Sequence, residues 1–131
     1  MEKNKRVFLY TESAHLKESL SEFIQSFGGY EILDVDTSLK ELYYHLNYLQ
    51  PEIIIIDTKT HLLNISEFTS KLNTFDSKTP ILFLSNREND QLNDYLNSYR
   101  NSSYLLKKDI VNQLEDKLNY TEKLAQITIH D

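Results

Sequence analysis

The sequence predicts an α/β protein in which a doubly wound, parallel, five-stranded sheet lies between two layers of helices. Two observations indicate this class. Five short apolar segments alternate with five longer segments whose apolar residues recur at helical spacing. The third apolar segment, residues 53–56, consists of four isoleucines, which is typical of a strand buried on both faces of a parallel sheet. A βα unit repeated five times predicts a three-layer α/β/α domain.

Each predicted strand is a short apolar run bounded by a proline or by polar residues. Pro51 precedes the third run, Pro80 precedes the fourth, and Lys107 follows the fifth. The second run is less apolar than the others, so we place it nearer an edge of the sheet. The predicted strands are residues 7–10, 30–35, 53–56, 81–84 and 104–106.

Each predicted helix has an apolar stripe at spacings of three and four residues. The pair Gly28-Gly29 can end the first helix, and Thr37 or Ser38 can cap the second. The predicted helices are residues 14–27, 39–49, 65–75, 89–97 and 110–124. The inner face predicted for the last helix contains Ile110, Val111, Leu114, Leu118 and Leu124.

The length and composition exclude several classes of protein. We expect one domain, residues 1–124, and residues 125–131 either fray from the last helix or begin a connection to a further domain. The chain has no cysteine, which excludes disulfides and thiolate chemistry. The apolar runs are too short to span a membrane, and no signal-peptide core follows the basic N-terminus, so we expect a cytoplasmic protein. A net charge of −6 without a basic stripe argues against direct contact with nucleic acid.

Polar residues follow four of the five predicted strands. The carboxyl ends of parallel strands meet at one edge of the sheet, where ligands usually bind. The first strand is followed by Thr11 and Glu12, the third by Asp57, the fourth by Ser85 and the fifth by Lys107. This set suits phosphoryl chemistry, because a carboxylate can attack as the nucleophile and an ammonium offsets phosphate charge. No Ser/His/Asp catalytic constellation is suggested by the order of the residues.

Three segments, in this order, resemble the receiver domains of bacterial two-component response regulators. Residues 51–57, Pro-Glu-Ile-Ile-Ile-Ile-Asp, are similar to the family segment around the phosphoacceptor. Residues 79–85 resemble the strand that ends in the switch Thr or Ser, and residues 104–107 resemble the strand with the switch aromatic residue and the pocket lysine. The resemblance covers residues 5–124 and implies a flavodoxin-like (βα)5 fold.

The resemblance also implies a role for individual residues. Asp57 would accept a phosphoryl group from a histidine kinase, Lys107 would pair with the phosphoryl oxygens, and Ser85 would hydrogen-bond them. Tyr104 would rotate inward as Ser85 moves, and so change the surface of the fourth helix, fifth strand and fifth helix. By the same resemblance this surface would form a homodimer, and an attached output domain would regulate transcription.

The sequence departs from the family in the acidic pocket. The family has two adjacent acids after the first strand to hold Mg²⁺, whereas this chain has Thr11 and Glu12. Mg²⁺ demands near-octahedral oxygen ligands, so a site built from Glu12 and Asp57 would be weak or absent. The ammonium of Lys59 could replace the charge of the ion, and two acids would then face two lysines. We therefore expect a pocket that needs no metal and in which phosphotransfer is slow or absent.

Two alternatives remain open. The chain could be a pseudo-receiver, a constitutive interaction module that works without phosphorylation. It could also be a small α/β enzyme or a flavin-binding protein, although the absence of a Gly/Ser/Thr-rich loop after the first strand argues against this class. We expect a signalling protein rather than an enzyme, with a histidine kinase or another signalling protein as its partner.

Overall fold

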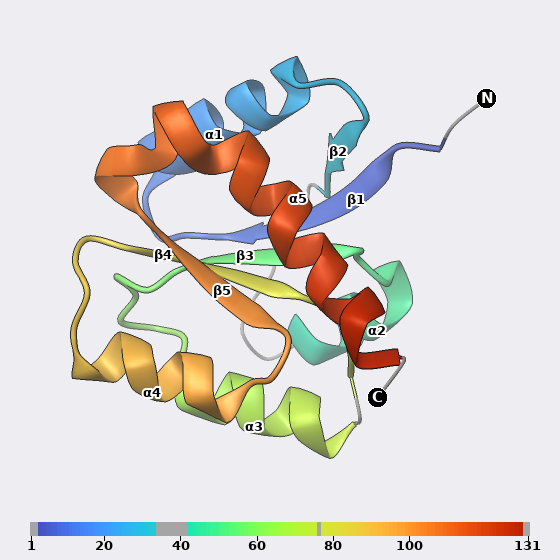
Figure 1. The fold of residues 1–131 in the computed structure, drawn as a ribbon, viewed down its shortest axis with the longest axis vertical. Coiled ribbons are helices and arrows are strands. Elements are labelled where there is room, and N and C mark those ends of the chain that lie inside the picture. Colours follow the sequence, from blue (N-terminus) through green and yellow to red (C-terminus); the bar gives the residue numbers. More distant parts are fainter. Residues whose placement is uncertain (1–2, 34–41, 76, 130–131) are drawn as a thin grey trace.

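The computed structural model describes residues 3–33, 42–75 and 77–129. Five parallel strands form one sheet in the order β2-β1-β3-β4-β5, with helices on both faces (Figure 1). The strands are β1 Lys5–Tyr10, β2 Tyr30–Ile32, β3 Ile53–Asp57, β4 Ile81–Ser85 and β5 Ser102–Leu106. The helices are α1 Ala14–Ser26, α2 Leu42–Leu49, α3 Ile65–Thr74, α4 Asp90–Ser98 and α5 Ile110–Ile129. The predicted fold class and the edge position of β2 are confirmed.

The central strand β3 is buried along its whole length, as its four isoleucines predict. It lies between β1 and β4, and Ile54 pairs with Phe8 on one side and with Ile81 on the other. Each isoleucine of β3 is at most 1% exposed. A strand in this position has helices over both faces, so every side chain is apolar until the chain reaches the edge of the sheet at Asp57.

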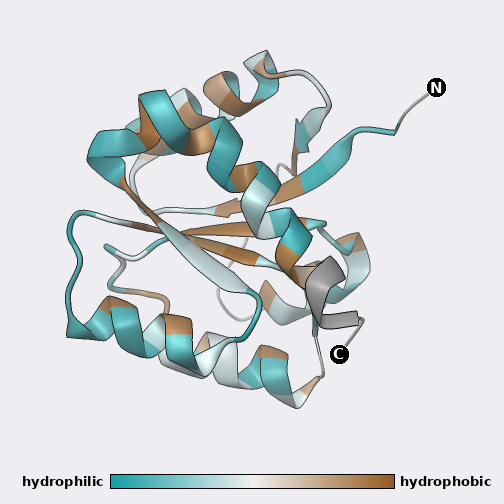
Figure 2. Ribbon diagram, in the orientation of Figure 1, coloured by the Kyte–Doolittle hydropathy of each residue, from teal (hydrophilic) through white to brown (hydrophobic). Residues whose placement is uncertain are grey.

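Alternate residues of β3 contribute to two separate cores. Ile54 and Ile56 pack with residues of α2, α3 and α4, such as Phe68. Ile53 and Ile55 pack with residues of α1 and α5, such as Leu118. Figure 1 shows these two helical layers on opposite sides of the sheet, and Figure 2 shows the apolar strands between helices whose outer faces are polar. The side-chain alternation of the strand therefore produces the doubly wound architecture.

The last helix differs from the prediction in its length and in its buried face. It continues through Ile129, beyond the predicted end at residue 124. Val111 was predicted to be buried but is 78% exposed. The face of α5 that contacts the core is the stripe of Ile110, Leu114 and Leu118, and Val111 lies to one side of this stripe. The buried stripe begins at Leu114 and ends at Thr121, whose hydroxyl pairs with that of Ser103 on β5.

Several other boundaries differ by a few residues. Strand β2 ends at Ile32, and residues 34 and 35 of the predicted strand lie outside the described residues. Helix α3 ends at Thr74, which leaves Phe75 68% exposed. The predicted caps Thr37 and Ser38, and Leu39 of the predicted stripe, lie outside the described residues. No helix within the described ranges is both long and apolar enough to cross a membrane.

Candidate functional site

Asp57 is the last residue of β3 and is only 2% exposed. Its Oδ1 lies 2.7 Å from the ammonium of Lys107 and accepts a hydrogen bond of 3.0 Å from the backbone N–H of Lys59. Its Oδ2 accepts a hydrogen bond of 2.8 Å from the hydroxyl of Thr11. Both carboxylate oxygens therefore have protein partners, as a buried charge requires.

The parallel register brings these residues together. Tyr10 pairs with Ile56, so Thr11 follows β1 directly beside Asp57. On the other side β4 pairs with both β3 and β5, and Lys107 follows the last residue of β5. The sequence predicted that Thr11, Asp57 and Lys107 converge, and the structure confirms it. The hydrogen bond from Thr11 to Asp57 was not predicted, although the strand order alone would have indicated the contact.

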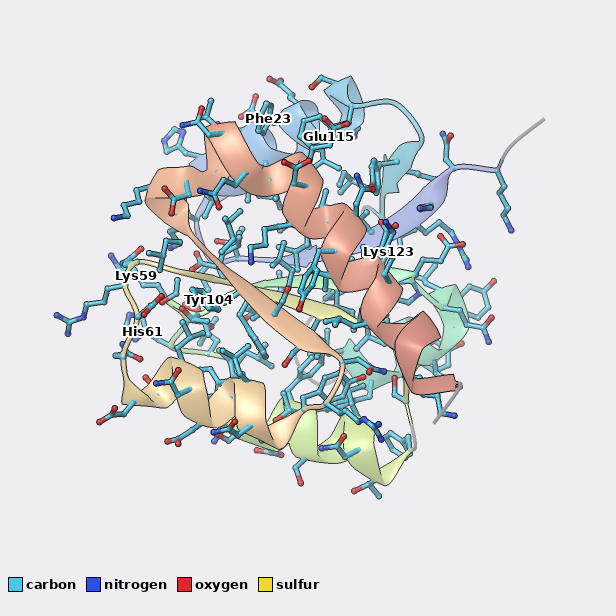
Figure 3. The ribbon with its side chains drawn as sticks, viewed as in Figure 1. Phe23, Lys59, His61, Tyr104, Glu115 and Lys123 are labelled. Carbon is cyan, nitrogen blue, oxygen red and sulfur yellow. The ribbon has the colours of Figure 1, made fainter. Side chains whose placement is uncertain are left out.

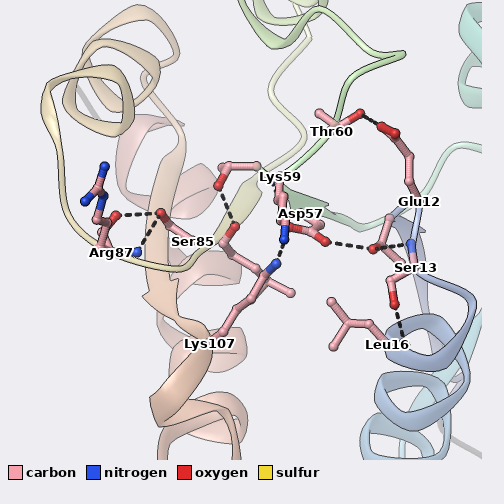
Figure 4. Close-up of polar contacts among 12 residues, drawn as sticks. Glu12, Ser13, Leu16, Asp57, Lys59, Thr60, Ser85, Arg87 and Lys107 are labelled. Carbon is pink, nitrogen blue, oxygen red and sulfur yellow. Dashed lines mark hydrogen bonds and ion pairs between the residues drawn. The ribbon is translucent and has the colours of Figure 1, made fainter.

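Glu12 points away from Asp57, toward the loop between β3 and α3 (Figure 4). Its Oε2 accepts hydrogen bonds from the hydroxyl of Thr60, from the N–H of His61 at 2.6 Å and from the N–H of Leu62 at 3.2 Å. The bond from Thr60 is the main reason that the pKa of Glu12 lies below its ordinary value. Glu12 therefore fastens the loop after Asp57 to the end of β1.

The residues present do not fit a Mg²⁺ site. Asp57 supplies one carboxylate, and the carboxylate of Glu12 is bound to the neighbouring loop. Within the described ranges no group of three or more His, Cys, Asp or Glu side chains is arranged to hold a metal ion. Mg²⁺ needs several oxygen ligands in near-octahedral geometry, and this pocket offers an ammonium in their place.

The side chain of Lys59 does not take the place that the sequence suggested for it. It is exposed and forms no ion pair with Asp57, and only its backbone N–H contacts the carboxylate. Figure 3 places Lys59 at the same end of the sheet as His61 and Tyr104. Among the residues that the structure describes, Lys107 is therefore the one cation that forms an ion pair with Asp57.

Ser85, the last residue of β4, is buried but its hydroxyl does not contact Asp57. It donates to the carbonyl of Arg87 at 2.6 Å and accepts from the N–H of Arg87 at 3.3 Å. Thr58, which follows Asp57, is held to the end of β4, because both its N–H and its hydroxyl donate to the carbonyl of Leu84. A movement of Ser85 toward Asp57 would require the turn at Arg87 to open.

Tyr104 on β5 is half-buried and packs against the core that contains Phe83 and Tyr95. Its hydroxyl donates a hydrogen bond to Glu88 in the loop before α4, and the ammonium of Lys117 on α5 lies 5.7 Å from its ring centroid. The bond to Glu88 is the main cause of the raised pKa of Tyr104. Glu88 was not singled out in the sequence, because nothing in the pattern of a polar loop marks one acid as the partner of a distant tyrosine.

We expect the substitution Glu88→Gln to lower the pKa of Tyr104 toward its ordinary value. The carboxylate of Glu88 raises this pKa because it accepts a hydrogen bond from the neutral phenol and repels the phenolate, and a neutral amide removes the repulsion. Ultraviolet titration of the tyrosines, compared with the matched substitution Glu18→Gln on α1, measures the change. A pKa that stays in its raised position would contradict the contact.

We expect Glu12→Ala to release the loop that follows Asp57. The amide protons of His61 and Leu62 should exchange with solvent much faster, because their acceptor is lost. In the unchanged chain the pKa of Glu12 is lowered, so ionised Glu12 stabilises the folded loop fully at a pH above the ordinary pKa of a glutamate. This stabilisation is lost as the pH falls through the lowered pKa. Exchange rates that are equal in both proteins would show that Glu12 does not hold the loop.

Comparison with solved structures supports the fold. A DNA-binding response regulator of the LuxR family from Staphylococcus aureus matches 90% of this chain and 98% of its own, with a TM-score of 0.75 and 15% identity. The signal receiver domain of a putative Luxo repressor protein from Vibrio parahaemolyticus matches 95% of both chains, with a TM-score of 0.78 and 18% identity. The receiver domain of a modulated diguanylate cyclase from Desulfovibrio desulfuricans G20 matches 96% of this chain and 99% of its own, with a TM-score of 0.76 and 17% identity.

No protein-family model and no curated protein sequence matches the chain. The structural likeness extends over nearly the whole chain, whereas the sequence identity is low. Such a likeness concerns the arrangement of the strands and helices and not the activity. This chain has the fold of a response-regulator receiver domain.

Proposed function

We propose that the chain is an atypical receiver domain in two-component signal transduction, with Asp57 as the phosphoacceptor. The observation that carries this proposal is the buried carboxylate of Asp57 at the end of the central strand, 2.7 Å from the ammonium of Lys107. A buried acid at the carboxyl edge of a parallel sheet, beside one cation, is suited to attack a phosphoryl group. The partner is a histidine kinase, which such a domain meets in the cytoplasm.

In the proposed reaction, an oxygen of Asp57 attacks the phosphorus of a phosphohistidine. The new P–O bond makes an acyl phosphate on Asp57, the P–N bond breaks, and the imidazole leaves with the electron pair and takes up a proton. Oδ2 is the oxygen more easily released, because a neutral hydroxyl from Thr11 holds it, whereas Lys107 holds Oδ1. Lys107 then pairs with the phosphoryl oxygens.

The pocket is proposed to work without Mg²⁺ and to transfer phosphate slowly. One carboxylate faces one ammonium, so there is no surplus negative charge for a divalent cation to neutralise. The phosphoryl group adds negative charge that Lys107 alone must offset. Asp57 attacks phosphorus from a state in which both of its carboxylate oxygens accept hydrogen bonds. An oxygen must lose its partner before it can attack, which raises the activation barrier of phosphotransfer.

The proposed output is a change in the surface formed by α4, β5 and α5. The ammonium of Lys117 lies 5.7 Å from the ring centroid of Tyr104 and 5.4 Å from that of Tyr120. Inward rotation of Tyr104 would break its bond to Glu88 and remove one of the two rings beside Lys117. A protein partner or a second copy that contacts this surface would sense the change.

A second candidate function is a constitutive interaction module that is never phosphorylated. The hydrogen bonds within the site favour this function. Both oxygens of Asp57 have protein partners, and the hydroxyl of Ser85 is bonded to the backbone of Arg87. In this case the ion pair with Lys107 would be a structural element. The surface around Tyr104 would then have one fixed form.

Intact-protein mass after incubation with acetyl phosphate separates the two candidates. We expect a slow phosphoryl adduct that forms equally well with Mg²⁺ and with a chelator, and that is absent in Asp57→Asn. An adduct that requires Mg²⁺ would contradict the metal-free pocket. The absence of an adduct under conditions that label an ordinary receiver would contradict phosphorylation of Asp57 and favour the constitutive module.

A further inference from the structure

A cavity of about 760 Å³ lies between α2 and α3, near the amino ends of β3 and β4 and therefore at the other end of these strands from Asp57. Its volume is within the range of small-molecule sites, roughly 300 to 1,000 Å³. Leu46, Ile54 and Leu72 form its buried apolar floor. Tyr44 and Phe75, each 68% exposed, line it from α2 and from the end of α3.

The wall of this cavity formed by the end of α2 and by Gln50 and Pro51 is held in place by a side chain from β1. Helix α2 is followed by Gln50, whose φ of 48° turns the chain sharply into Pro51. The guanidinium of Arg6 on β1 fixes this turn by donating to the carbonyls of Leu49 and of Gln50, the latter at 2.7 Å. The wall is therefore formed before any ligand arrives.

The second wall, just before β4, is held in the same manner. The hydroxyl of the buried Tyr99 donates its hydrogen bond to the carbonyl of Thr79 at 2.7 Å, and it also lies 3.2 Å from the carbonyl of Ser77. The side-chain amide of Asn101 donates to the carbonyl of Lys78 at 3.0 Å. A cavity with walls fixed in advance loses little entropy on binding, which favours a ligand site over a surface irregularity.

The charge of the cavity indicates the kind of ligand. Among the described residues that line it, Lys78 carries the only formal charge, although the whole chain has a net charge of −6. None of the described residues forms an ion pair with Lys78. The nearby Lys71, in contrast, is 3.3 Å from Glu67 and lies over the ring of Tyr43. Lys78 is exposed and lines the cavity, so its ammonium is available to pair with an anionic group of a ligand.

We propose that this cavity binds a small, planar aromatic carboxylate. The ring would lie on the floor formed by Leu46 and Leu72, near Tyr44 and Phe75, and the carboxylate would pair with Lys78. Aromatic rings prefer offset or edge-to-face contact with such side chains. The site is separate from Asp57, so binding does not depend on the proposed phosphotransfer.

Backbone N–H NMR spectra of the ¹⁵N-labelled full chain test the proposal. The two probes are naphthalene-2-carboxylate and the neutral naphthalene-2-carboxamide. We expect saturable shifts around Asn47 and around residues 77–79, and none around Asp57. The carboxylate should bind about two- to fivefold more tightly than the amide, the advantage expected from an exposed ion pair. The same titration in Asp57→Asn should give the same result.

Two variants make the test specific. Lys78→Gln should bind both probes equally, whereas the matched variant Lys108→Gln should keep the preference for the carboxylate. Asn47→Trp, which places a large side chain at the cavity, should abolish the binding of both probes while the rest of the amide spectrum stays folded. Shifts that do not saturate, or a preference for the carboxylate that survives in Lys78→Gln, would overturn the proposal.

Discussion

Replacing Lys107 by methionine is expected to destabilise the protein by about 3 kcal/mol at neutral pH. The substitution leaves the carboxylate of Asp57 buried without an opposite charge, and breaking a buried ion pair in this way costs about 3 to 5 kcal/mol. We take the lower end of this range because the side chain of Lys107 is 20% exposed and because Thr11 and Lys59 still donate to Asp57. Urea unfolding measures the loss.

The double variant identifies the cause of this loss. In the Asp57→Asn background the buried negative charge at this site is removed, so Lys107→Met should cost less than about 1 kcal/mol. The neighbouring Lys108 is exposed, and Lys108→Met should change the stability by no more than about 0.5 kcal/mol. If Lys107→Met costs the same in both backgrounds, its effect does not arise from the pair with Asp57.

Replacing Thr11 by aspartate is expected to create a dependence on Mg²⁺. The hydroxyl of Thr11 lies 2.8 Å from Asp57, so a carboxylate there would place two negative charges in contact. Two like charges about 4 Å apart repel by about 4 kcal/mol at an effective dielectric constant of about 20, and Lys107 offsets part of this. We expect a loss of about 2 to 3 kcal/mol in a chelator, which a saturating concentration of Mg²⁺ should largely restore.

The substitution Thr11→Val is the matched control. It keeps the shape of the side chain and removes only the donor to Asp57, so it should cost about 1 kcal/mol and should not respond to Mg²⁺. Thermal unfolding of both variants with Mg²⁺ and with a chelator gives the comparison. A Thr11→Asp variant as stable as the unchanged chain in the chelator would show that residue 11 does not set the charge of the pocket.

The sequence predicted the parts of the fold that depend on apolar pattern. Four consecutive isoleucines admit no exposed face, so β3 had to be a central strand. The parallel order then placed Asp57 and Lys107 together, because strand ends meet at one edge of the sheet. The burial of Val111 was predicted wrongly: its spacing from Leu114 and Leu118 fits the buried stripe, but the pattern does not show how wide the contact face of α5 is.

The orientations of the polar side chains at the site could not be predicted in this way. Glu12 follows β1 as expected, but its direction is set by donors in the loop at Thr60 and His61. Ser85 and Tyr104 likewise bond to the loop residues Arg87 and Glu88. Apolar periodicity does not define the geometry of loops, and a short polar side chain selects among several nearby partners.

The binding of Mg²⁺ to the unchanged chain tests the central claim most directly, because the claim is that Lys107 and Thr11 satisfy Asp57 without a metal. The measurement is the amide spectrum of the nitrogen-labelled protein during a titration with MgCl₂, with Thr11→Asp as the positive control. We predict that the amides of residues 57–59 show no saturable shift in the unchanged chain and a clear one in the control. A saturable shift of these amides in the unchanged chain, with an affinity like that of an ordinary receiver, would contradict the account.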